Sequence, residues 1–123
     1  MPHVKIRPAP PLVELFEKLE RMSLRDETGV QKIREYFMER GEGRILAEGL
    51  VAEGGLPRLF FISIQDRDGE LVIRCYESTD PEKTPAVKRL ILRLGMAAQA
   101  LNEGSVLDPC NLEKEAGELG LIP

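Results

Sequence analysis

The sequence has few of the side chains on which acid–base, nucleophilic and metal chemistry most often depend. Its 123 residues include one histidine, His3, and two cysteines, Cys75 and Cys110. A general base must be held within hydrogen-bonding reach of the proton that it removes, and His3 lies in a proline-rich segment that offers no such support. The two thiols and the imidazole also lack the spacing of zinc ligands. We therefore predict no catalytic residue, no metal and no cofactor, and the sequence favours a non-enzymatic role.

Aromatic residues and long apolar runs are scarce as well. There is no tryptophan, and there are four phenylalanines and two tyrosines, so Leu, Ile, Val and Ala must fill the core. No apolar run approaches the ~18 residues of a membrane span, and no apolar stretch follows the basic N-terminal residues as it would in a secretory signal. Two widely spaced cysteines are typical of thiols in a reducing compartment. We expect a cytoplasmic protein without a membrane partner.

The chain carries no excess of positive charge. Its formal net charge is −4, and the segment after residue 102 accounts for all of it. Such an acidic segment repels nucleic acid and membrane surfaces. A chain of this length makes one domain. We expect residues 1–123 to form a single α+β domain, with a flexible proline-rich arm over residues 1–11 and an acidic C-terminal appendage over residues 105–123.

Three strands are predicted in the middle of the chain, over residues 44–53, 58–65 and 70–77. Each is rich in branched and aromatic side chains, and the glycine-containing segments between them, residues 54–57 and 66–69, have turn chemistry. The middle strand is apolar on nearly both faces, which favours a central position in the sheet.

Helical spacing of apolar residues predicts helices over residues 12–22, 29–40 and 82–103. Gly41 and Gly104 then stand where the second and third helices would end. The expected fold class is therefore α+β. It is a three-stranded antiparallel meander with the N-terminal helices and the long C-terminal helix on one face, in the order helix–helix–strand–strand–strand–helix, followed by a short acidic helical tail.

Four cations gather in the first half of the helix predicted at residues 82–103. Most of them lie opposite its apolar stripe, and the N-terminal half of a helix favours anions. We therefore consider them candidate contacts to an anion or to nucleic acid. The residues are Lys83, Lys88, Arg89 and Arg93.

The predicted order of helix, three-stranded meander and helix over residues 12–102 resembles that of double-stranded-RNA-binding domains. In that family, a lysine-rich start of the last helix contacts phosphates across the RNA major groove. This chain departs from the family by the inserted helix at residues 29–40 and by the spacing of Lys83 and Lys88. The resemblance implies nucleic-acid binding, which is our alternative function.

The predicted sheet has more apolar surface than three helices can cover, since a three-stranded sheet has two edges and two faces. The surplus indicates a homodimer or a protein partner. Our leading interpretation is a non-enzymatic protein-interaction module, namely an adaptor, a chaperone-like protein or a regulator that acts as a homodimer. In size and acidity the chain resembles secretion-type chaperones. The expected interaction surface consists of Leu59, Phe61, Leu71 and Ile73.

Overall fold

Residues 1–41 and 43–120 are described by a computed structural model, in which sheet dominates over helix. The strands are β1 (His3–Arg7), β2 (Met22–Asp26), β3 (Gly29–Met38), β4 (Arg44–Glu53), β5 (Leu56–Arg67), β6 (Glu70–Cys75) and β7 (Val106–Asp108). The helices are α1 (Leu12–Lys18), α2 (Pro85–Ala100) and α3 (Glu113–Glu118), with short 3₁₀ turns η1 (Glu77–Thr79) and η2 (Cys110–Leu112). Together they form an α+β fold built on one antiparallel sheet.

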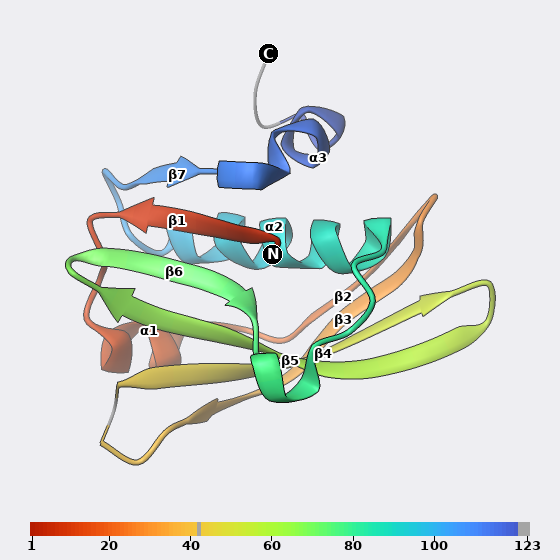
Figure 1. Cartoon of the computed structure of the whole chain (residues 1–123). Coiled ribbons are helices and arrows are strands. Elements are labelled where there is room, and N and C mark those ends of the chain that lie inside the picture. The colour runs from red at the N-terminus through yellow and green to blue at the C-terminus, as the bar shows by residue number, and fades with distance from the viewer. Residues whose placement is uncertain (42, 121–123) are drawn as a thin grey trace.

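The sheet has seven strands in the described part of the chain, in the order β2–β3–β4–β5–β6–β1–β7. It curls around α2 like half of a barrel (Figure 1). The prediction of a three-stranded meander with two N-terminal helices is therefore wrong. The three expected strands occur as β4, β5 and β6, but they form only the middle of a wider sheet.

The helix predicted over residues 29–40 is a strand, β3, which pairs with β2 on one side and β4 on the other. A β-bulge between Ile33 and Glu35 explains the misleading pattern. The bulge adds one residue to the strand and shifts its alternation, so that Ile33 and Tyr36 are both buried although they are three residues apart. An interval of three is also the spacing of a helix face.

Both terminal segments belong to the sheet. The expected arm over residues 1–11 contains β1, which lies between β6 and β7 and buries Val4 and Ile6 completely. The expected appendage over residues 105–123 contributes β7 and also buries Leu112 and Ala116 in the core. Burial of apolar surface thus extends to the arm that was expected to be flexible and to the acidic appendage.

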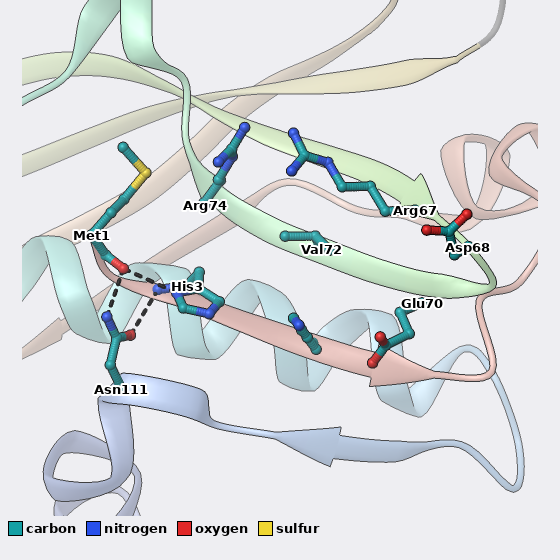
Figure 2. A pocket seen from close by; sticks show the side chains of 9 residues that line it. Met1, His3, Arg67, Asp68, Glu70, Val72, Arg74 and Asn111 are labelled. Atoms are coloured by element: carbon teal, nitrogen blue, oxygen red, sulfur yellow. Dashed lines mark hydrogen bonds between the residues drawn. The ribbon is translucent and has the colours of Figure 1, made fainter.

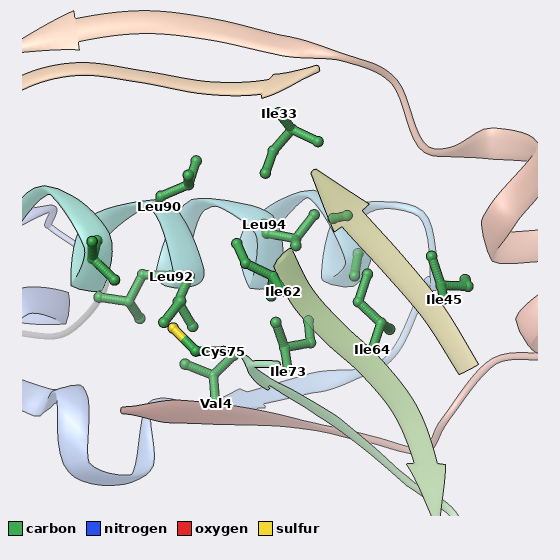
Figure 3. Packing of buried hydrophobic residues seen from close by; sticks show 14 of the residues in the cluster. Val4, Ile33, Ile45, Ile62, Ile64, Ile73, Cys75, Leu90, Leu92 and Leu94 are labelled. Atoms are coloured by element: carbon green, nitrogen blue, oxygen red, sulfur yellow. The ribbon is translucent and has the colours of Figure 1, made fainter. Parts of the chain in front are cut away.

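The core lies between the inner, concave face of the sheet and α2. Leu90 and Leu94 of the helix meet Ile33, Ile62 and Ile73 of the strands (Figure 3). The helix begins with Pro85 after the Thr84 cap, whose hydroxyl oxygen accepts a hydrogen bond from the Val87 backbone.

The outer, convex face of the sheet is the face opposite α2, and none of the helices described in residues 1–41 and 43–120 covers it. α1 adds Leu15 to the core on the inner side, and α3 packs on α2 and η2. None of the described helices is long and apolar enough to cross a membrane. Because the described helices do not cover the outer face, its side chains are accessible to a binding partner.

Candidate interaction surface

Apolar side chains gather on the outer face where β3, β4 and β5 lie side by side. Phe37 lies opposite Leu46, and Leu50 lies opposite Leu59. The rings of Phe37 and Phe61 meet edge to face, with their centroids 6.2 Å apart. Phe37 is 47% exposed and Leu59 is 58% exposed, and the other three are partly exposed. We call this surface the outer apolar patch: Phe37, Leu46, Leu50, Leu59 and Phe61.

The charges within the outer apolar patch balance one another. Arg34 forms an ion pair of 3.6 Å with Glu48, whose strand position is directly opposite Phe61. Glu35 accepts a hydrogen bond of 2.8 Å from Arg21, and this bond holds the pKa of the Glu35 carboxyl below its usual range. The patch therefore presents apolar side chains together with two acidic side chains that are each paired with an arginine.

The structure separates the four residues of the predicted interaction surface. Leu59 and Phe61 lie on the outer face, as part of the outer apolar patch. Leu71 and Ile73 point to the inner face and are completely buried in the core, because Ile73 lies opposite Ile64 of β5, which also points inward. Leu71 and Ile73 cannot contribute to an exposed surface of this fold.

Three members of the outer apolar patch were missed by reasoning from sequence. Phe37 was assigned to a helix that does not exist. Leu46 and Leu50 alternate with buried Ile45 and Val51 along β4. That alternation indicates that Leu46 and Leu50 share the face of β4 opposite the core. Placing them next to Phe37 also requires the knowledge that β3 lies beside β4.

The four cations predicted as anion contacts lie on or just before α2, and each has an acidic partner. Lys88 lies 3.6 Å from Glu115 of α3. Arg89 has a side chain only 7% exposed and sits 2.7 Å from Glu27. This geometry leaves little positive charge free for phosphates. The remaining pairs are Lys83–Asp80, Arg89–Asp26, Arg89–Glu118 and Arg93–Asp26.

The centre of this charge network is Asp26, at the end of β2. One of its carboxylate oxygens accepts hydrogen bonds from the Thr28 backbone and hydroxyl, and the other accepts from Gln31, Arg89 and Arg93. Burial by itself raises the pKa of Asp26, but these hydrogen bonds outweigh it and hold the pKa far below its usual range. The network ties the β2–β3 hairpin to α2, which is a structural role.

In residues 1–41 and 43–120, no group of three or more His, Cys, Asp and Glu side chains is placed to hold a metal ion. Both thiols are free, and burial raises the pKa of Cys75 to about 11. A thiol with so high a pKa is almost wholly protonated at neutral pH and is a poor nucleophile.

The sequence matches no family model, and it matches no solved structure. It is similar to a tRNA (guanine-N(7)-)-methyltransferase of Thermotoga maritima, with 26% identity over 81 residues. The matched part covers 66% of this chain and 25% of that enzyme, so the chain spans about a quarter of the enzyme's length. This distant similarity does not establish the family of the chain.

Proposed function

We propose that this chain is a non-enzymatic protein-interaction module that acts as a homodimer through its outer apolar patch. The observation that carries the proposal is the cluster of exposed Phe37 and Leu59 with the partly exposed ring of Phe61, on a sheet face that no described helix covers. Clustered apolar surface of this kind is typical of interaction sites. Its burial against a second surface would be favoured by the hydrophobic effect.

A second copy of the chain is the partner that we favour. In a two-fold symmetric interface each copy presents the same surface, so that surface must not repel itself. Glu35 is paired with Arg21 and Glu48 with Arg34, so Lys32 leaves one positive charge beside the patch. A largely apolar surface whose other charges are paired can face its own copy with little repulsion between like charges.

We further infer that the module acts in a reducing compartment such as the cytoplasm, where an adaptor, chaperone-like or regulatory protein would meet its partners. The two free thiols, Cys75 and Cys110, support this location.

The test is a single substitution in the outer apolar patch. Leu59→Lys introduces a charge at an exposed position, so the fold should keep its thermal stability. In a symmetric dimer the charge enters the interface twice, and burying it without a partner should weaken association by about 100-fold or more. Sedimentation velocity at micromolar concentration should give about twice 13.8 kDa for the unmodified chain and a monomer for the variant.

A matched control is Val106→Lys on β7. Val106 is 66% exposed and lies at the far edge of the sheet, away from the patch. The control should remain dimeric. A monomeric unmodified chain at every concentration, or equal effects of the two lysines, would rule out this interface.

Nucleic-acid binding through Lys83, Lys88, Arg89 and Arg93 is the second candidate. The distant similarity to an enzyme named for tRNA methylation favours it. The acidic partners of these four cations argue against it, because a phosphate would have to displace a carboxylate at each one. Measuring the binding of a tRNA at several salt concentrations tests this candidate. Binding through these cations should weaken steeply as the salt concentration rises, because each phosphate contact releases counterions.

A further inference from the structure

We propose that a pocket over β6 and β1 on the outer face binds a phosphate ester. The pocket has a volume of about 490 Å³ and is lined by His3 and Lys5 of β1, by Val72 and Arg74 of β6, and by Arg67 at the end of β5 (Figure 2). It does not share a residue with the outer apolar patch, so the proposal is independent of the homodimer.

The strand register explains why the surface is hollow at this point. Val72 lies opposite Lys5 on β1 and opposite Gln65 on β5, and its neighbour Arg74 lies opposite His3. A short, branched side chain is thus surrounded on the same face by longer ones. Val72 forms the floor of the pocket, and the longer side chains form its walls.

The walls bring together three cations that the protein itself neutralises poorly. In the described part of the chain, no carboxylate oxygen lies within 4.0 Å of the side-chain nitrogens of Lys5 or Arg67. Arg74 has a carboxylate partner, Glu77, only at 4.0 Å. Three cations around one hollow repel one another, and a bound anion would relieve that repulsion.

The position of Arg67 suits it to receive an anion. Its Nε donates a hydrogen bond of 3.2 Å to the Gln65 side chain. Figure 2 shows its guanidinium group folded back along the sheet, on the same side of Val72 as the guanidinium group of Arg74. Two guanidinium groups and one ammonium group match the several acceptor oxygens and the roughly −1.5 to −2 charge of a phosphate monoester.

The carboxylates of the pocket restrict what else the ligand can carry. Asp68 and Glu70 lie at the β5–β6 turn, whereas Arg74 and His3 lie at the opposite end (Figure 2). Glu70 is also paired with Arg7, outside the pocket lining. The two carboxylates disfavour a second phosphate at the turn and can accept hydrogen bonds from hydroxyl or amino groups. The pocket therefore suits one phosphate on a hydroxyl-bearing group, as in a mononucleotide or at the end of an RNA strand.

Titration of the ¹⁵N-labelled chain with AMP, inorganic phosphate and adenosine tests this inference. AMP and phosphate should shift the amide signals of residues 3–5 and 67–74, and adenosine should not. Arg67→Gln should weaken AMP binding about 10-fold, because it removes a charge-assisted hydrogen-bonding partner. Lys114→Gln makes the same change of charge at an exposed position on α3, and it should leave AMP binding unchanged.

A short RNA with and without a 5′-phosphate separates the two sources of the ligand. Binding of AMP alone would assign the pocket to a free phosphate ester, and binding of both AMP and the 5′-phosphorylated RNA would include RNA ends. The proposal is overturned if neither AMP nor phosphate shifts the pocket signals, or if adenosine binds as well as AMP. It is also overturned if Arg67→Gln behaves like Lys114→Gln, or if RNA binds equally well without the 5′-phosphate.

Discussion

Replacing Asp26 by alanine is expected to lower the free energy of unfolding by about 3 kcal/mol, because removing one partner of a buried ion pair leaves the other charge uncompensated. For a chain of this size the loss corresponds to a fall of roughly 10–15 °C in Tm. Arg93 would lose its ion pair with Asp26, and the partners left to Arg89 among the described residues, Glu27 and Glu118, are more exposed than Asp26. Thermal unfolding followed by circular dichroism measures the effect, with the exposed Glu113→Gln as a control.

The contribution of Asp26 should also depend on pH in a defined direction. Its pKa is lowered in the folded chain, where hydrogen bonds from Thr28, Arg89 and Arg93 overcome the opposing effect of burial. A lowered pKa stabilises the fold fully at pH values above the unfolded pKa of about 4, and this stabilisation is lost as the pH falls toward the folded pKa. The gap in unfolding free energy between the unmodified chain and Asp26→Ala should therefore narrow below about pH 4. If this difference in unfolding free energy stays constant with pH, or matches the difference measured for Glu113→Gln, the hydrogen bonds to Asp26 do not stabilise the fold as described.

Replacing Gly29 by alanine should destabilise the fold by more than about 3 kcal/mol, since it combines backbone strain with a backbone clash. Gly29 has a φ of +128°, and a Cβ there would lie 2.2 Å from the carbonyl oxygen of Ala52 on β4. Neither the oxygen nor the strand can move without breaking the pairing of β3 with β4. Chemical denaturation with a two-state fit measures the loss.

Gly54→Ala is the matched control for Gly29→Ala. Gly54 also has a positive φ, +58°, but no atom lies within 4 Å of the Cβ that would be added. Gly54→Ala should therefore lower the free energy of unfolding by only about 1–2 kcal/mol, which is the cost of a left-handed backbone conformation for alanine. Equal losses for the two variants would show that the β2–β3 turn does not approach Ala52 as closely as described.

Local patterns in the sequence were sufficient to predict the middle strands and the long helix. The predicted strand at residues 44–53 matches β4, and the helix predicted at residues 82–103 contains α2. The pairing of β1 with β6 and β7 could not be predicted in this way, because those strands are far apart in the sequence and β1 lies among prolines. The β2–β3 hairpin was not predicted, because the bulge in β3 gives the apolar residues of that strand the spacing of a helix.

The candidate surface was predicted only in part, for a related reason. Leu59 and Phe61 were identified from their own strand, but Phe37 joins them only through the sheet order β3–β4–β5. The four predicted cations do lie on or just before α2, but Arg89 is buried there. Their partners Asp26 and Glu115 come from distant segments, so no local pattern could show that these charges are paired.

The most direct test of the proposed homodimer is a dilution series followed by ¹H–¹⁵N spectra of the unmodified chain. Association through the outer apolar patch should make the amide shifts of Phe37, Leu46, Leu50, Leu59 and Phe61 depend on protein concentration. The signals of the edge strands β2 and β7 should stay constant over the same series. The series must extend to concentrations at which sedimentation shows the dimer dissociating. Spectra that stay constant over that range, or changes confined to β2 or β7, would contradict association through the outer apolar patch.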